Sequence, residues 1–149
     1  STVAIQCEQA GWNIIKRSDN TNPNTGTDIV IGDTMGELLA FYGAADIAFV
    51  GGSLVPVGGH NLIEPAAWAC PVISGPHLFN FSEVERLLKE NNALVIAKNS
   101  DELAAAIKKW LTDETLRKNA GERAKQVADN NRGALKKLCM LIAEIKKAA

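Results

Sequence analysis

Over its first 100 residues the chain alternates short apolar runs with helical stretches, and this alternation limits the possible folds more than anything else. The apolar runs do not alternate with polar residues, as the strands of a half-exposed antiparallel sheet would. They therefore predict parallel strands that are buried on both faces and joined by right-handed helical crossovers. We expect these strands at residues 12–17, 28–32, 46–50, 71–75 and 93–97.

Helices are expected between the strands and, after residue 100, in place of them. Thr34 and Asn61 are predicted to open two of the helices, because short polar side chains favour the N-cap position. The expected helices span residues 3–10, 35–44, 61–69, 83–90, 101–111, 114–129 and 132–147. The predicted fold is a doubly wound, Rossmann-like α/β domain with a parallel sheet and a helical C-terminal tail.

Composition excludes several classes of protein. With 149 residues, 46% hydrophobic and 22% charged, the chain is typical of one globular domain. Its net charge of −1 indicates no global attraction to nucleic acid. Its three cysteines, Cys7, Cys70 and Cys139, are far apart and form no CxxC pair, which argues against a disulfide framework or a zinc site. No apolar run is long and unbroken enough to predict a membrane span.

The ends of the chain differ in charge and in character. Residues 101–149 carry a basic excess and residues 1–100 an acidic one, and we favour a solvated outer face over a phosphate- or membrane-facing patch. The chain begins Ser1-Thr2-Val3 without an initiator Met, inside an apolar-periodic pattern. We therefore expect a fragment of a longer protein.

Three loops follow predicted strand ends, where ligands bind in open parallel sheets. They span residues 32–37, 51–65 and 74–81, and the first two are rich in glycine and lead into predicted helices. Glycine lets a ligand approach the backbone, and a helix N-terminus offers unpaired N–H groups that suit phosphate. Such glycines can also serve only as tight turns, but two of these loops in one crevice favour an anion or nucleotide site.

Several polar residues near these loops have two interpretations. Glu64 can accept the two hydroxyls of a ribose or can simply favour the positive end of a helix dipole. His60 and His77 can approach each other, but the Ser and Asn oxygens around them are poor ligands for a transition metal, so no metal site is predicted. Asp33 and Asp46 lie at strand boundaries, where capping is the usual role. No GxGxxG, P-loop or GxSxG motif is present.

Four motifs in order resemble the bacterial 3-deoxy-D-manno-octulosonic acid (Kdo) transferases. They are Gly32-Asp33-Thr34-Met35-Gly36-Glu37-Leu38, Ala44-Ala45-Asp46 with Phe49-Val50-Gly51-Gly52-Ser53, Gly58-Gly59-His60-Asn61 with Glu64-Pro65, and Gly75-Pro76-His77 with Phe79-Asn80-Phe81. Asn131-Arg132-Gly133-Ala134 also resembles the family's C-terminal sequence. The resemblance extends from Arg17-Ser18 to about Leu138.

The resemblance implies a GT-B glycosyltransferase with two Rossmann-like domains. The chain resembles part of the C-terminal domain, which binds the donor CMP-Kdo, and the first strands of that domain and the whole N-terminal domain are expected to lie outside it. The reaction implied is transfer of Kdo to a lipid A precursor in lipopolysaccharide biosynthesis, at the cytoplasmic face of the inner membrane, with the membrane anchor in the N-terminal region. No metal, other cofactor or nucleic acid partner is implied.

The resemblance also assigns roles to residues of this chain. The cytidylate phosphate would meet the backbone at Met35-Gly36-Glu37, Gly51-Gly52-Ser53 would line the donor pocket, and Glu64 would hold the ribose hydroxyls. The full set of expected donor-binding residues is Arg17, Thr34, Met35, Gly36, Glu37, Gly51, Gly52, Ser53, Gly59, His60, Asn61 and Glu64. The catalytic base of the family lies in the N-terminal domain, so no catalytic residue is assigned to this chain.

Two alternatives share parts of this pattern. A GT-B enzyme that uses a UDP-sugar, a glycosyltransferase or an epimerase, would have the same glycine-rich turns and ribose carboxylate. A non-enzymatic flavodoxin-like domain would have the fold without nucleotide affinity.

Overall fold

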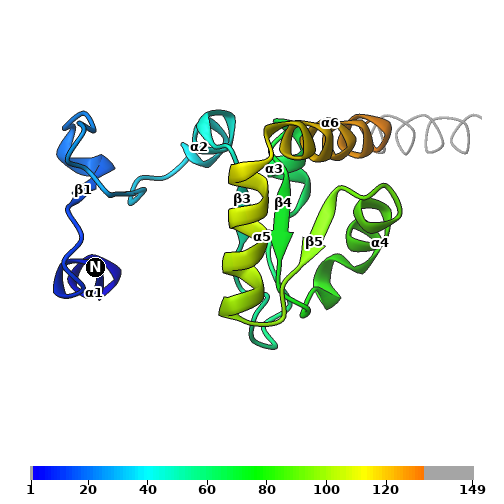
Figure 1. Cartoon of the computed structure of the whole chain (residues 1–149), viewed down its shortest axis with the longest axis horizontal. Helices are drawn as coiled ribbons and strands as arrows, with labels where there is room; N and C mark the ends of the chain where they lie inside the picture. Colours follow the sequence, from blue (N-terminus) through cyan, green and yellow to red (C-terminus); the bar gives the residue numbers. More distant parts are fainter. Residues whose placement is uncertain (1, 133–149) are drawn as a thin grey trace, which may run out of the picture. The chain divides into compact units, whose positions relative to one another are not determined.

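The computed structural model describes residues 2–132, which fall into two compact units divided between Phe41 and Tyr42. Each unit is described by itself (Figure 1). All of the predicted helix at 132–147 except Arg132, including its apolar residues Leu135, Leu138, Cys139, Ile142 and Ile145, lies outside the described residues.

The first unit contains two parallel strands preceded by a helix. Helix α1 (Thr2–Gln9) ends before Gly11, whose φ of +85° is a conformation that glycine adopts readily. Strand β1 (Ile14–Lys16) leads into a short 3-10 helix, η1 (Arg17–Asp19), and β2 (Ile29–Ile31) pairs with β1 in parallel. Helix α2 (Leu38–Ala44) begins in this unit and ends in the second.

The second unit contains a three-stranded parallel sheet in the order β3-β4-β5. Its elements are β3 (Ala48–Val50), α3 (Ile63–Ala67), β4 (Val72–Ser74), η2 (Phe79–Phe81), α4 (Ser82–Glu90), β5 (Leu94–Ile96), α5 (Ser100–Thr112) and α6 (Glu114–Asn130). The predicted alternation of parallel strands and helices is therefore confirmed, and so are the two long helices after residue 100.

Both faces of the β3-β4-β5 sheet are covered. On one face Val50, Val72 and Leu94 pack with apolar residues of α3, α4 and α6. On the other face Ile73 packs with Trp110 of α5 and Ala120 of α6. Figure 1 shows α5 and α4 on different sides of the strands. Because both faces are largely covered, the strands need no polar alternation. Ser74 is the one polar residue of the three strands, and Phe49 of β3 is 38% exposed.

Three details of the fold differ from the prediction. The strands form two sheets, β1-β2 and β3-β4-β5, where one sheet was expected. Helix α2 begins at Leu38 and not at Met35, because Gly36 has a φ of +84°, which is incompatible with an α-helix. Helix α3 likewise starts at Ile63, two residues after the predicted opening at Asn61.

Helix α6 packs tightly against the turn between α3 and β4. Ala69 lies in that turn with a φ of +54°, and a Cβ atom added to Gly121 of α6 would lie 2.0 Å from the Ala69 carbonyl oxygen. Glycine at 121 thus allows the helix to approach the backbone of the turn directly.

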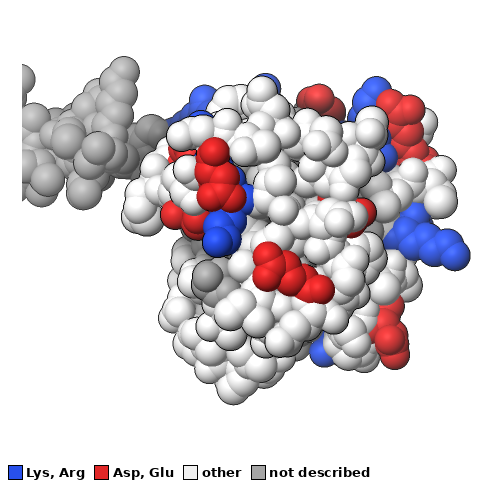
Figure 2. Space-filling model, turned by 90° about the vertical axis from the view of Figure 1, so that its left-hand side faces the viewer, with Lys and Arg blue, Asp and Glu red and all other residues white. Residues whose placement is uncertain are grey.

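Charged side chains of both signs share the surface. Figure 2 shows Lys and Arg interspersed with Asp and Glu on one face, with no continuous patch of a single sign among the described residues drawn there. Arg117 of α6 pairs with Asp46, and Lys118 with Glu114. Within residues 2–132, no helix combines the length and the apolarity that crossing a bilayer requires.

Candidate functional site

In the first unit, residues of η1 hold the loop that follows β2. Ser18 donates two hydrogen bonds to Asp33, from its backbone nitrogen at 3.0 Å and from its hydroxyl at 2.7 Å. These bonds, the hydroxyl first, lower the pKa of Asp33 below its usual value. Asp33 therefore ties the start of the loop to the end of β1.

The end of the same loop is held by Glu37. The Thr34 hydroxyl donates a hydrogen bond to its carboxylate, and Arg17 forms an ion pair with it at 3.0 Å. The Thr34 bond, with a smaller contribution from Arg17, lowers the pKa of Glu37. The Thr34 side chain was predicted to cap the following helix, but it binds the side chain of Glu37. Arg17 also donates to Asn20 Oδ1 at 3.2 Å.

Four consecutive backbone N–H groups remain available in this loop. Within the described part of the chain, no hydrogen bond is formed by the amide nitrogens of residues 34–37. Met35 is 98% exposed and Gly36 has a left-handed φ, so the loop presents its backbone to solvent. Successive free N–H groups in a turn make an anion-binding concavity. The free groups belong to a turn before α2, and not to the helix N-terminus that was expected.

A pocket of about 360 Å³ lies beside Arg17. It is lined by Ile15, Arg17, Asn20, Thr21, Asn22, Pro23, Val30 and Phe41. The Phe41 ring also approaches Gly32, where an added Cβ would lie 2.8 Å from a ring carbon. Sequence analysis assigned no role to Asn20 or Phe41, because only the folded unit brings them beside Arg17.

In the second unit, the loops after β3 and β4 meet at the carboxyl edge of the sheet. His77 N donates to Ser53 O at 3.0 Å, and Gly75 N donates to Ser53 Oγ at 2.8 Å. The prediction that these two loops open on the same edge is confirmed. The loop at residues 32–37 belongs to the other unit, and its place on that edge stays a prediction.

Three positions in the loop after β3 have backbone conformations that favour glycine. Gly52, Gly58 and Gly59 have φ values of +68°, +105° and +74°. A Cβ at Gly59 would lie 2.5 Å from Leu78 Cδ2, and one at Gly52 would lie 3.2 Å from His60 Nε2. These residues therefore combine a left-handed backbone with close approach, which only glycine allows without strain.

Glu64 lies in the first turn of α3, held by Asn61. The Asn61 amide donates to Glu64 Oε1 at 3.1 Å, while Asn61 Oδ1 accepts the Ile63 N–H at 3.0 Å. Glu64 is half-buried, and Oε2 accepts no hydrogen bond from the described residues. Tyr42 is close to this carboxylate, since the pKa of Tyr42 is raised by burial and then by the charge of Glu64. One carboxylate oxygen is thus available to a ligand.

Ser53 was expected to line the donor pocket, but its side chain is buried. Its side chain is 0% exposed, and its hydroxyl donates to Val50 O at 2.6 Å as well as accepting from Gly75. Gly51 and Gly52, next to it, are partly exposed. The hydroxyl of Ser53 therefore connects the two loops and does not face a ligand.

The histidines do not make a metal site with other ligands. His60 is exposed and packs against Gly52, and His77 is partly exposed in the loop after β4. Across residues 2–132, no group of three or more His, Cys, Asp and Glu side chains could hold a metal ion. Cys70 is buried, which raises the pKa of its thiol to about 11, so it stays protonated at neutral pH.

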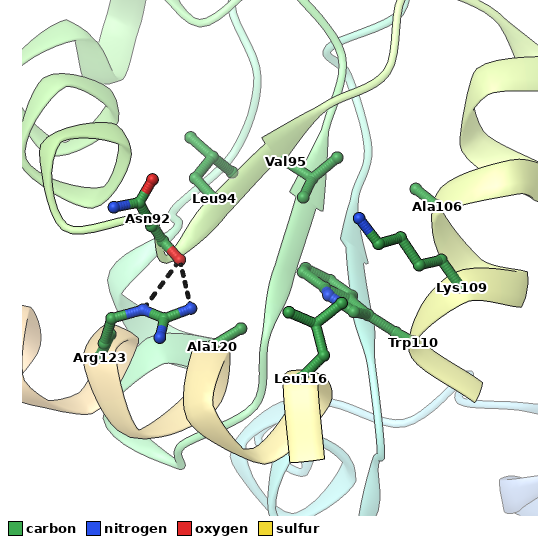
Figure 3. Close-up of a pocket in the computed structure, with 9 residues that line it drawn as sticks. All are labelled: Asn92, Leu94, Val95, Ala106, Lys109, Trp110, Leu116, Ala120 and Arg123. Carbon is green, nitrogen blue, oxygen red and sulfur yellow. Dashed lines mark hydrogen bonds between the residues drawn. The ribbon is translucent and has the colours of Figure 1, made fainter. Parts of the chain in front are cut away.

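A second pocket, of about 270 Å³, lies at the opposite edge of this sheet (Figure 3). It is lined by Asn92, Leu94, Val95, Ala106, Lys109, Trp110, Leu116, Ala120 and Arg123. Arg123 donates to the Asn92 carbonyl through Nε at 3.1 Å and Nη2 at 3.0 Å. These bonds attach α6 to the turn before β5, at the amino ends of the strands. Ligands of open parallel sheets bind at the carboxyl ends, so this pocket is not the candidate site.

Comparison with known proteins identifies the family. Residues 12–127 match the family described as "Glycosyl transferases group 1". The chain belongs to this family. The match includes both loops at which the candidate residues lie.

Several relatives that the chain resembles are Kdo transferases. It is 43% identical over 143 residues to the 3-deoxy-D-manno-octulosonic acid transferase of Haemophilus influenzae, covering 95% of the chain and 34% of that protein. It is 46% identical over 84 residues to the enzyme of the same name from Bordetella pertussis, covering 56% of the chain and 20% of that protein. The resemblance drawn from the sequence motifs is confirmed, and the chain spans about a third of the H. influenzae protein.

A solved structure with the same fold is the C-terminal CMP-Kdo binding domain of WaaA from Acinetobacter baumannii. The TM-score is 0.77 at 30% sequence identity, over 81% of this chain and 63% of that chain. This likeness confirms the predicted α/β fold of a glycosyltransferase domain.

Proposed function

We propose that this chain is part of the donor-binding domain of a Kdo transferase and that it binds CMP-Kdo. The observation that carries the proposal is Glu64, which Asn61 holds in the first turn of α3 with one carboxylate oxygen available. The 43% identity to the H. influenzae Kdo transferase over 95% of the chain supports the choice of donor.

We assign the proposed roles within each unit by itself. The free N–H groups of residues 34–37 bind the cytidylate phosphate, and Arg17 offsets the negative charge of Glu37 beside them. Glu64 accepts the ribose hydroxyls at the start of α3, where His60 is exposed and Gly58 and Gly59 are buried. Backbone donors aimed at the phosphate stabilise the charge that develops on CMP as it leaves, which needs no metal ion.

The remaining parts of the reaction are proposed to lie elsewhere in a longer protein. The acceptor is a lipid A precursor at the cytoplasmic face of the inner membrane, and the catalytic base and membrane attachment belong to an N-terminal domain. No residue of this chain acts as the base in this proposal.

The free edge of β3 supports the proposal that the domain continues beyond this chain. Among the described residues β3 pairs with β4 only, yet Ala48 and Val50 are buried and the strand carries no Lys or Pro to protect an edge. We propose that a further parallel strand of the longer protein pairs there. Hydrogen exchange of the Phe49 amide is expected to slow in the longer protein, and exchange as fast as in the 149-residue chain would contradict this pairing.

Titration of the chain with CMP and with UDP tests the donor. CMP is expected to bind and UDP to bind more weakly. Preference for UDP would favour an enzyme that uses a UDP-sugar, and affinity for neither nucleotide would favour the non-enzymatic alternative.

A further inference from the structure

We propose that Ser53 is a positioning residue of the donor site, whose buried hydroxyl sets the place of the Gly58–Glu64 turn without touching the donor. The inference rests on the proposed function, because it assigns a role within the proposed CMP site. The sequence motif Gly51-Gly52-Ser53 suggests that Ser53 contacts a ligand directly, but its side chain is 0% exposed.

The Ser53 hydroxyl forms both a donated and an accepted hydrogen bond within the protein. Its proton goes to Val50 O at 2.6 Å, and its oxygen accepts the Gly75 N–H at 2.8 Å. The side chain is 0% exposed. A ligand in the crevice therefore cannot receive a hydrogen bond from this hydroxyl unless the bond to Val50 breaks.

Ser53 joins the loops after β3 and β4 through its backbone as well. The carbonyl of Ser53 accepts the His77 N–H at 3.0 Å. Gly75 lies so close that an added Cβ would be 2.2 Å from the Ser53 carbonyl oxygen. The two loops are thus in direct backbone contact around one serine.

This junction continues into the turn that carries the proposed nucleotide contacts. Gly59 N donates to Gly52 O at 2.8 Å, one residue before Ser53, and an added Cβ at Gly59 would lie 2.5 Å from Leu78 Cδ2. Gly59 is therefore held between both loops. Asn61 follows two residues after Gly59 and holds Glu64 by a hydrogen bond. A displacement of the backbone at Ser53 would therefore also displace the Glu64 carboxylate.

Ser74 is a matched control within the same sheet. It is the other buried polar residue of the described chain, also 0% exposed, and it lies at the end of β4 next to Gly75. Unlike Ser53, its Oγ has no hydrogen-bond partner among the described residues. Serine-to-alanine at the two positions makes the same chemical change and removes the junction at only one of them.

The experiment compares Ser53→Ala and Ser74→Ala in the 149-residue chain by CMP titration and by amide NMR without ligand. Ser53→Ala is expected to weaken CMP binding by about tenfold, which corresponds to the loss of one hydrogen bond. It is also expected to speed exchange of the Gly75 and Gly59 amides and to shift the amide signals of residues 59–64. Ser74→Ala is expected to bind CMP like the wild type.

The outcomes separate this inference from its alternatives. Weaker CMP binding without changes at residues 59–64 in the free protein would make Ser53 a direct ligand contact and overturn the inference. Equal losses in both variants, or unchanged affinity in Ser53→Ala, would also overturn it. If Ser53→Ala does not fold, Ser53→Cys, whose slightly larger thiol forms weaker hydrogen bonds than the hydroxyl, takes its place with the same expectations. Absence of CMP binding by the wild type would instead contradict the proposed function.

Discussion

Each carboxylate at the strand ends is held by a particular polar side chain. Asp33 accepts from Ser18, Glu37 from Thr34 and Arg17, and Glu64 from Asn61. A carboxylate held in this way has a set direction. Only Glu64 keeps an oxygen without a partner among the described residues, and this oxygen can meet a ligand without first losing conformational freedom.

Replacement of Glu64 tests its role in binding the ribose. In the longer enzyme that we propose, Glu64→Ala is expected to lower kcat/KM for the proposed donor CMP-Kdo by about 30- to 150-fold, because losing charge-assisted hydrogen bonds costs about 2–3 kcal/mol. Steady-state kinetics with varied donor measure the effect. Glu122→Ala, which removes an exposed carboxylate of α6, is the control and should leave the kinetics unchanged. Unchanged KM and kcat in Glu64→Ala would rule out the ribose assignment.

The pKa of Glu37 reports the state of the loop at residues 34–37. Because this pKa is lowered in the folded chain, ionised Glu37 stabilises the fold above its unfolded-state pKa of about 4.3, and the contribution disappears as pH falls through the lower folded-state value. NMR titration should show a rise in the Glu37 pKa in Thr34→Ala, where the main cause is lost, and a smaller rise in Arg17→Ala. The Asp33 pKa should stay low in both variants, since Ser18 holds it. A Glu37 pKa unaffected by both changes would contradict this account.

Helix α6 approaches the backbone of a neighbouring turn closely at Gly121. Gly121→Ala is expected to lower the free energy of unfolding by about 1–3 kcal/mol, although alanine favours a helix, because the new Cβ would overlap the Ala69 carbonyl. Urea denaturation measures the change. Gly51→Ala is the control, since nothing lies within 4 Å of a Cβ there and its φ is not left-handed. A Gly121→Ala variant as stable as the wild type would show that α6 can move away from the turn at no cost.

For the molecule as a whole, we predict that the 149-residue chain by itself transfers no Kdo. Positioning of donor, acceptor and base can account for about 7–11 kcal/mol of a barrier, and the proposal places acceptor and base in another domain. Incubation with CMP-Kdo and a lipid A precursor tests this, with CMP binding by the same preparation as the control for folding. Product at a rate near that of the full-length enzyme would place the base within these residues.

Local sequence patterns predicted the helices and strands well. They predicted less well where some helices begin and which strands pair. The apolar runs located all five strands, and Asn99 and Asp113 cap α5 and α6 through bonds to Glu102 N and Leu116 N. The start of α2 was predicted too early. A glycine in the sequence is compatible with a turn or with a helix, so the left-handed conformation of Gly36 could not be predicted from the sequence. Which strands share a sheet depends on contacts distant in sequence, which local patterns do not contain.

For the candidate site, the sequence alone determined which residue types follow the strand ends: glycines where the backbone must be approached, and Asn61 and Glu64 at a helix start. Those choices follow from local backbone chemistry, so the motifs are visible without a structure. Only the tertiary structure decided what each side chain does. It buried Ser53 between two loops, paired Arg17 with Glu37 and placed Phe41 beside Arg17, because hydrogen bonding and burial depend on neighbours that only folding brings together.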